Sequence, residues 1–413
     1  MKFEIWHHLR TTRLRCQPGR GTRITDLMKK TIESYLPELI AIRHDFHQHP
    51  ELGFEENRTS GVIVRTLEKY GIDVHTGWAG TGVVGVLRRG DSERTVALRA
   101  DMDALPVQER PELSYRSVNE GVMHACGHDG HMAMLLGAAR YLAEKGSFDG
   151  TVIFIFQPAE EGGGGGRLMV EEGIIEKFGI QAAFGMHNRS GLDAGSITTR
   201  TGPIMAATDN FEIIVHGEGT HAALPHTGVD PIVTASELVT SLQTAVTREI
   251  RALDGVVLSV TQFVSGTTFN VIPDDAILRG CTRYQSAETG DLLQEAMKRI
   301  TAGVCAAHKA RYTFRYMPGY PPTVNTPAET EDAVRAATKA VGANKVDGNC
   351  SPLMASEDFS YFLDKIPGCY IFLGNGTHTR SHRSDFDFND GIITAGVAYW
   401  VHLAEHVLRD GGG

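Results

Sequence analysis

One thiol and three imidazoles fall within residues 123–131. Cys126 and His128 stand two residues apart, shortly before a helical pattern that begins near Met132. Thiolate and neutral imidazole are both good ligands for zinc-like ions. A Cys-x-His pair alone is a weak signal, because a buried free cysteine beside helix-capping residues gives the same pattern. The pair therefore predicts a metal site only if ligands from other parts of the chain lie near it.

Further candidate ligands follow segments that have the apolar character of buried strands. The carboxyl ends of parallel strands meet at one edge of an open α/β sheet, where such folds place their chemistry. The predicted strands span residues 95–100, 151–156, 182–187 and 370–374, and the polar residues at or after their ends are Asp103, Glu160, Glu161, His187 and His382. Each residue alone has a structural explanation, such as a solvated acidic turn or a hydrogen-bonded core histidine.

Taken together, five residues suit a dinuclear metal site in which one ligand bridges the two ions. They are Cys126, His128, Glu161, His187 and His382. Adjacent carboxylates point in different directions, so one of Glu160 and Glu161 can bind metal while the other faces a substrate. A second acidic pair, Glu357 and Asp358, stands at a predicted helix start, where it serves either the helix dipole or a function.

Composition limits the classes of protein to consider. The chain has 413 residues, which is too long for one ordinary core, so two domains are expected. The net charge of -10 argues against nucleic-acid or anionic-membrane surfaces, and no apolar run approaches the ~20 residues of a membrane span. Six cysteines without a Cys-x-x-Cys pair suit a reducing compartment, and we expect a cytoplasmic protein.

The order of the predicted elements indicates an α/β fold with a split larger domain. Helices alternate with apolar strands over residues 28–202 and 318–413, which predicts a sheet covered by helices on both faces. Residues 203–317 have the order β-α-β-β-α-β of a ferredoxin-like α+β unit, inserted into the larger domain. The arginine-rich residues 1–27 are expected to add nothing to the fold. The first helix should begin at Met28, and Pro37 interrupts its pattern.

Nine stretches, in the same order along the chain, resemble those of family M20 metallopeptidases of the amidohydrolase branch. That branch holds hippurate hydrolases, N-acyl-amino-acid amidohydrolases, N-acetyl-diaminopimelate deacetylases and plant auxin-conjugate hydrolases. The stretches are residues 43–51, 100–106, 123–131, 157–165, 186–187, 217–226, 270–273, 356–359 and 382–390. The resemblance covers the chain from about residue 28 to 408.

The resemblance implies two divalent metal ions per subunit, with Cys126 as the bridge and the other four ligands completing the shells. Glu160 would be the general base that takes a proton from the water between the metals and hands it to the leaving amine. Asp103 would orient a ligand imidazole.

The resemblance also assigns residues of the inserted domain, which in the family forms a lid and pairs two subunits. His221 matches a histidine that stabilises the oxyanion across a homodimer. The residue before that histidine is usually glycine, whereas here it is Thr220. Asn270 and Arg283 match positions that could meet the substrate carbonyl or carboxylate, although a strand-end turn and a surface charge explain them equally well.

We interpret the sequence as a dimetal amidohydrolase that cleaves N-acyl or N-aroyl amino acids, with small hippurate-like molecules as the leading substrates. N-acetyl amino acids, N-acetyl-diaminopimelate and auxin conjugates are alternatives. A metal-stabilised binding protein without catalysis is a rival from another class, but it would have no need of Glu160. An aminopeptidase would need a carboxylate for the substrate ammonium, and none is visible. The ligands suit manganese or zinc, and also admit cobalt or nickel.

Overall fold

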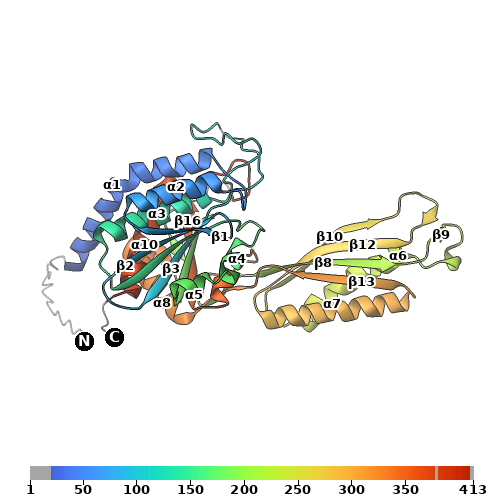
Figure 1. The fold of residues 1–413 in the computed structure, drawn as a ribbon. Helices are drawn as coiled ribbons and strands as arrows, with labels where there is room; N and C mark the ends of the chain where they lie inside the picture. The colour runs from blue at the N-terminus through green and yellow to red at the C-terminus, as the bar shows by residue number, and fades with distance from the viewer. Residues whose placement is uncertain (1–19, 111, 377–379, 410–413) are drawn as a thin grey trace, which may run out of the picture.

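An eight-stranded sheet forms the centre of the larger domain (Figure 1). The computed structural model of the chain describes residues 20–110, 112–376 and 380–409. From one edge to the other the strands are β1 (Asp73–Trp78), β2 (Gly82–Arg89), β4 (Gly150–Gln157), β3 (Thr95–Asp101), β5 (Ala182–Ser190), β16 (Gly368–Gly376), β6 (Ile197–Thr198) and β15 (Val346–Asp347). The four central strands β4, β3, β5 and β16 run parallel. Their carboxyl ends therefore lie at the same edge of the sheet.

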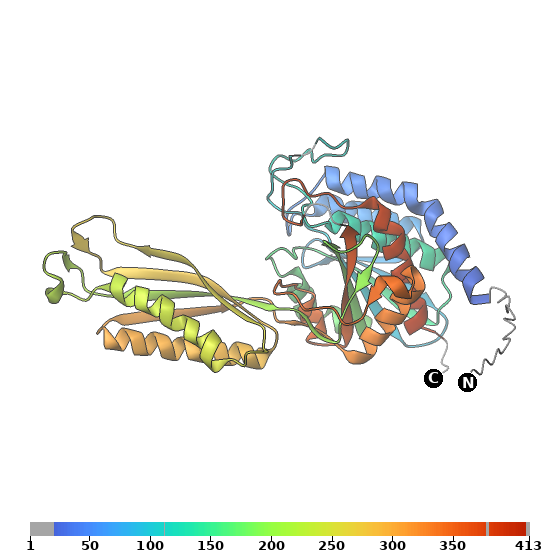
Figure 2. The ribbon, with the colours of Figure 1, turned by 180° about the vertical axis from the view of Figure 1, so that it is seen from behind.

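Helices cover both faces of this sheet, as the sequence predicts (Figures 1 and 2). One face packs against α1 (Arg20–Gln48), α2 (Asn57–Lys69), α3 (His128–Lys145), α8 (Pro327–Val341) and α10 (Ile393–Val407). The other face packs against the short helices α4 (Gly165–Glu171), α5 (Ile174–Phe178) and α9 (Ser360–Leu363). Strands β3 and β16 are buried along their whole length, which explains their continuous apolar sequence.

Four predictions about helices need correction. Helix α1 begins at Arg20, so part of the 1–27 segment is helical, while residues 1–19 lie outside the described part of the chain. The helix also continues through Pro37, because packing against α3 and α10 offsets the backbone hydrogen bond that proline removes. Helix α3 begins at His128 rather than near Met132. The helix expected at 356–363 is short and begins at Ser360.

The inserted domain has the predicted β-α-β-β-α-β order. Its elements are β8 (Ala207–His216), α6 (Pro231–Thr244), β10 (Val256–Ser265), β12 (Asp275–Tyr284), α7 (Ala287–Ala307) and β13 (Arg311–Pro318). The strands form an antiparallel sheet in the order β10-β12-β8-β13, and α6 and α7 share one core with it. Its far end carries the small sheet of β9 (Thr220–His221) and β11 (Val271–Ile272). The limits 203 and 317 stay predictions.

Two chain segments join the domains. Strand β7 (Gly202–Met205) leads into β8, and the segment after β13 leads into β14 (Thr323–Asn325), which pairs with β7. Short helical turns complete the fold: η1 (Pro225–Thr227), η2 (Ala245–Glu249), η3 (Ala343–Lys345) and η4 (Asp390–Ile392). Within the described ranges, every helix is too short or too polar to span a bilayer.

Candidate metal centre

The predicted ligands come together at the carboxyl edge of the large sheet. Two groups of three donors share the thiol of Cys126, and within each group the donor atoms lie within 4.8 Å of one another. The first group is Cys126, His128 and His187, and the second is Cys126, Glu161 and His382. The Cys126 Sγ lies 3.2 Å from His187 Nε2, and Glu161 Oε1 lies 3.0 Å from His382 Nε2. One shared donor between two donor groups is the arrangement that a dinuclear site requires.

A tight turn before α3 presents Cys126 and His128. Gly127 between them has a φ of 98°, a region that L side chains rarely adopt. A Cβ at this position would lie 2.3 Å from Asn188 Oδ1, so a side chain is also excluded by space. The glycine lets the chain pass from the cysteine directly into the helix, whose first residue is His128.

The loop after β4 carries the two adjacent glutamates. Ala159 has a positive φ of 50°, and its N–H donates to the buried Glu56 carboxylate at 2.9 Å. The N–H of Glu161 donates to Asp103 Oδ2, also at 2.9 Å. Both glutamates group with His128; in addition, Glu161 groups with Cys126 and His382, whereas Glu160 groups with the buried pair Glu357 and Asp358.

A buried arginine lies beneath these donors. Arg99, in β3, is 1% exposed and pairs with Asp101 at 2.9 Å, Glu357 at 3.0 Å and Asp358 at 2.9 Å. Its Nε donates to Gln157 Oε1 at 2.9 Å. Glu357 and Asp358 thus pair with a buried arginine just before α9. Arg99 was not among the predicted site residues, although a charged residue inside an apolar strand is a visible signal.

Carboxylates also fix the imidazoles. His128 Nδ1 lies 2.8 Å from the Asp103 carbonyl oxygen and 3.3 Å from Asp103 Oδ1. Behind it, His131 lies between Asp101, at 2.6 Å, and Asn188, also at 2.6 Å. The Nε2 atom of His128 is therefore the ring nitrogen that faces Cys126. His131 supports the donor cluster from behind and is not one of its predicted ligands.

The charges of the cluster call for cations. Burial, followed by the nearby carboxylate of Glu161, raises the pKa of the Cys126 thiol. Burial and then Glu357, Asp358 and Glu161 raise the pKa of Glu160 far above its usual value. Carboxylates and a thiol in such a setting are stable as anions only beside positive charge.

Unpaired donor atoms indicate where cations would bind. His128 Nε2 and Glu161 Oε1 are buried and have no hydrogen-bond partner among the described residues, although Glu161 Oε1 is within ion-pair distance of His382. Buried polar atoms are normally hydrogen-bonded, and His128 Nε2, which lies 3.7 Å from Asp101 Oδ2 without a hydrogen bond, is thus available to an ion. Thiolate, imidazole and carboxylate together fit divalent ions of the zinc and manganese type.

A cavity of about 890 Å³ opens over the cluster and reaches the inserted domain. Its wall contains the donors Cys126, Glu161, His187 and His382, the carboxylate of Glu160, and apolar side chains such as Met205, Leu353, Met354 and Phe372. Arg283, from β12, also lines it and donates to Ser356 Oγ at 3.0 Å. Of the site residues predicted in the inserted domain, Arg283 is thus the one that lines the cavity within a single chain.

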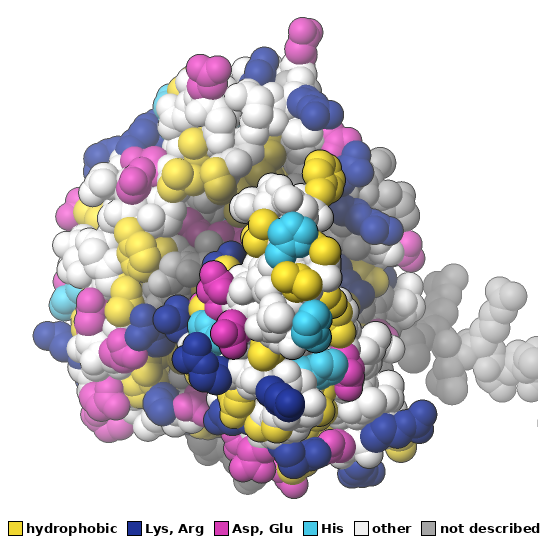
Figure 3. All heavy atoms as spheres, turned by 90° about the vertical axis from the view of Figure 1, so that its right-hand side faces the viewer, with side chains coloured by type: hydrophobic (Ala, Val, Ile, Leu, Met, Phe, Trp, Pro, Cys, Tyr) yellow, Lys and Arg dark blue, Asp and Glu magenta, His cyan; other side chains and the backbone are white. Residues whose placement is uncertain are grey.

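His221 and Asn270 lie elsewhere. Both are exposed, and they belong to the small β9–β11 region at the far end of the inserted domain (Figure 1). Figure 3 looks onto this end and shows histidine and hydrophobic side chains gathered there. Exposed Leu224, Phe269 and Val271 are among the apolar residues of this region. Within one chain, neither His221 nor Asn270 can contact a substrate at the cluster.

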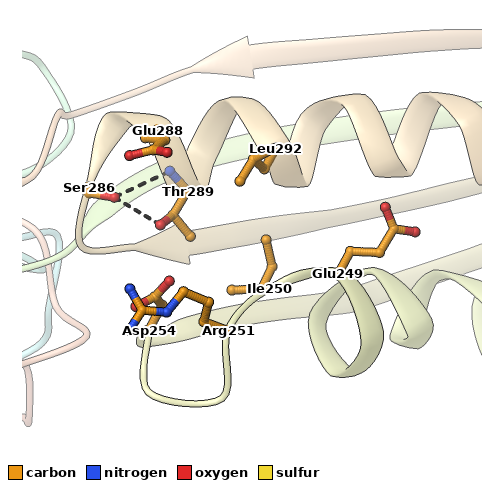
Figure 4. A pocket seen from close by; sticks show the side chains of 8 residues that line it. All are labelled: Glu249, Ile250, Arg251, Asp254, Ser286, Glu288, Thr289 and Leu292. Carbon is orange, nitrogen blue, oxygen red and sulfur yellow. Dashed lines mark hydrogen bonds between the residues drawn. The ribbon is translucent and has the colours of Figure 1, made fainter.

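A second cavity, of about 220 Å³, lies in the inserted domain between the start of α7 and the segment around η2 (Figure 4). Ser286, whose side chain caps α7 by accepting from Thr289 N, lines it together with Glu249, Arg251 and Glu288. None of its lining residues belongs to the donor groups of the cluster. The chemistry therefore lies in the larger cavity.

Comparisons with known proteins place the chain in a family. The model of peptidase family M20/M25/M40 matches residues 97–406. A hippurate hydrolase of Campylobacter jejuni is 39% identical over 90% of this chain and 97% of its own length, and an N-acetylcysteine deacetylase of Bacillus subtilis is 37% identical over 91% and 98%. Among solved structures, a dinuclear metal-binding M20 peptidase of Bacillus subtilis superposes with a TM-score of 0.81 and 34% identity, covering 91% of this chain and 99% of that one.

Removal of the shared thiol should empty the centre. Cys126→Ser replaces a thiolate by a neutral hydroxyl, a far poorer bridging ligand, so elemental analysis after dialysis should find a large loss of metal compared with the wild type. Cys281→Ser, in the wall of the same cavity but outside the donor groups, is the matched control and should keep its metal. A chelator should lower the melting temperature of the wild type, and Mn²⁺ or Zn²⁺ should restore it, because an ion that binds the native state stabilises it. Equal metal content in the two variants would contradict the assignment.

Proposed function

Because the chain belongs to peptidase family M20 and is a metal-dependent amidohydrolase of N-acyl amino acids, we propose that it cleaves hippurate-like N-aroyl amino acids with two bound divalent ions. The observation that carries the proposal is the pair of three-donor groups that share Cys126, next to the free carboxylate of Glu160. A hippurate hydrolase as a relative, 39% identical, supports the aroyl substrate.

The two donor groups divide the ligands between two positions. His128 and His187 would hold one ion, Glu161 and His382 the other, and Cys126 would bind both. When bound, the ions would supply Lewis-acid chemistry that activates water and polarises the amide carbonyl. Asp103 would keep this set in place, since it contacts His128 and accepts a hydrogen bond from the Glu161 backbone.

Glu160 is the residue that would move the proton. It lines the cavity beside the donors but belongs to neither group that contains Cys126. Its buried position next to Glu357 and Asp358 raises its pKa, so its carboxylate form is a stronger base that can take a proton from the attacking water. The same carboxyl group would then protonate the leaving amine. A protein that only binds metal or ligand would not need this carboxylate.

The cavity wall suggests how a substrate would lie. Phe372, Leu353 and Met354 offer an apolar surface for an aromatic acyl group. Arg283 offers a guanidinium to a carbonyl or carboxylate. His221 and Asn270 would contact the substrate only if a second subunit brings them to the cavity, so their proposed roles depend on a homodimer.

A substrate panel tests the proposal. The enzyme is reconstituted with Mn²⁺, Zn²⁺, Co²⁺ or Ni²⁺ and assayed with hippurate, N-acetyl amino acids, N-acetyl-diaminopimelate, an auxin conjugate and an unblocked dipeptide. We expect the highest kcat/KM for hippurate, because the apolar wall stabilises an aromatic acyl group. Preference for an acetyl substrate would replace the aroyl assignment by a deacetylase, preference for the dipeptide would indicate an aminopeptidase, and no hydrolysis at all would indicate a binding protein.

The two adjacent glutamates should respond differently to the same change. Glu160→Gln should keep both metal ions and lose at least the ~10² to 10⁴-fold that general acid–base catalysis supplies. Glu161→Gln should instead lose metal, because an amide is a poorer ligand than a carboxylate. Metal content is measured by elemental analysis, and activity by release of the free amino acid. Equal metal loss in both variants would show that the division between them is wrong.

Mixed dimers test whether His221 acts across subunits. Glu160→Gln and His221→Ala should each be nearly inactive alone. If each site uses Glu160 from one chain and His221 from the other, a mixed dimer has one site with both defects and one intact site. Equal co-expression with random pairing makes half the dimers mixed, so activity should recover to about a quarter of wild type, given two-fold symmetry. No recovery, in a mixture shown to contain mixed dimers, would place His221 in its own chain's site or in a structural role.

A further inference from the structure

A tyrosine from the segment that joins the two domains contacts the loop of the proposed general base. Tyr320 Oη donates to the carbonyl oxygen of Glu160 at 2.7 Å and accepts from the N–H of Gly164 at 3.1 Å. The phenol remains protonated, because burial and then the charges of Asp358 and Glu160 raise the pKa of Tyr320 far above its usual value. One hydroxyl therefore bridges two points of the glycine-rich loop after β4.

This contact completes a set of three along consecutive residues. Glu56 accepts from the N–H of Ala159, Tyr320 donates to the carbonyl of Glu160, and Asp103 accepts from the N–H of Glu161. Glu56 and Asp103 belong to the larger domain. Tyr320 is different, because it lies in the segment that returns from the inserted domain between β13 and β14.

The backbone of Tyr320 ties together both connections between the domains. Its carbonyl oxygen accepts from the N–H of Thr208 at 3.0 Å, at the start of β8. The neighbouring Gly319 N–H donates to the buried Asp209 carboxylate at 2.9 Å. Asp209 also accepts from the hydroxyls of Tyr284 and Tyr316, at 2.7 and 2.9 Å, so the base of the inserted domain is fixed to the same point.

We propose that Tyr320 is a positioning residue that sets the location of Glu160 according to the placement of the inserted domain. Its backbone belongs to the connecting segments, while its hydroxyl holds the loop that carries the base. A movement of the connecting segments changes the position of that hydroxyl, and the Glu160–Gly164 loop must follow it or lose two hydrogen bonds. Placement of the inserted domain over a substrate and alignment of the base are thereby coupled. This inference rests on the proposed role of Glu160 as the general base.

The test compares Tyr320→Phe with Tyr284→Phe. Both remove one tyrosine hydroxyl near the domain junction, but Tyr284 contacts Asp209 and not the loop. In metal-loaded Tyr320→Phe, kcat should fall about 10-fold, as expected for a loss comparable to one net hydrogen bond, while KM changes less than about two-fold and metal content is unchanged. Tyr284→Phe should retain wild-type kcat. An unchanged kcat in Tyr320→Phe overturns the proposal.

Two further measurements distinguish positioning from a general structural role. If Tyr320 acts through Glu160, adding Tyr320→Phe to Glu160→Gln should lower kcat less than about two-fold further, because the two residues act as one unit. A full 10-fold further loss overturns the proposal.

Hydrogen exchange of peptides that cover residues 160–166 needs no substrate, and it should become faster in Tyr320→Phe but not in Tyr284→Phe. Unchanged exchange would show that the hydroxyl does not hold the loop. If the wild type hydrolyses no member of the substrate panel, the proposed function fails, while the exchange result still decides whether Tyr320 holds the loop.

Discussion

The concentration of carboxylates at one sheet edge is the constraint on which the rest of this site depends. Arg99 lies inside the sheet and pairs with Asp101, Glu357 and Asp358, so the lower part of the cluster has a cation of its own. The upper part, around Cys126 and Glu161, has no such arginine among its described contacts. Uncompensated buried charge is strongly unfavourable. Divalent cations bound beside the thiol and the carboxylates would neutralise this charge. In the lower part of the centre, Arg99 therefore neutralises the carboxylates. In the upper part, bound metal ions would have to do so.

The fold brings these charges together from several separate parts of the chain. Four parallel strands end at one edge, and each end supplies only one or two groups. The turn at Gly127 adds Cys126 and His128 from the start of α3. The fully buried strands and the helices on both faces hold these ends rigidly, which keeps like charges from relaxing apart. The inserted domain stands outside this arrangement and reaches the cavity mainly through β12 and the connecting segments.

Much of this organisation could be predicted from the sequence, because buried parallel strands have continuous apolar sequences and the polar residues that end them stand out. The class of fold, the element order of the inserted domain and the grouping of the five ligand-type residues follow from that pattern. Arg99 did not, since its partner Asp358 lies 259 positions further along the chain and no local rule links them. Tyr320 lies in a segment rich in glycine and proline, which indicates only a connection. Helix α1 continues through Pro37 because of tertiary packing, which local propensity does not include.

The two adjacent glutamates illustrate how environment rather than residue type assigns chemistry. Glu160 and Glu161 have the same side chain, yet one lies beside Glu357 and Asp358 and the other beside Cys126 and His382. The difference arises in the backbone: the positive φ at Ala159 and three hydrogen bonds to residues 159–161 determine where each side chain leaves the chain. Burial, followed by the charges of Glu357 and Asp358, raises the pKa of Glu160. A carboxyl group with a raised pKa suits a proton carrier, whereas its neighbour Glu161 lies among metal-type donors. The backbone of residues 159–161 therefore takes part in assigning the chemistry of the two groups.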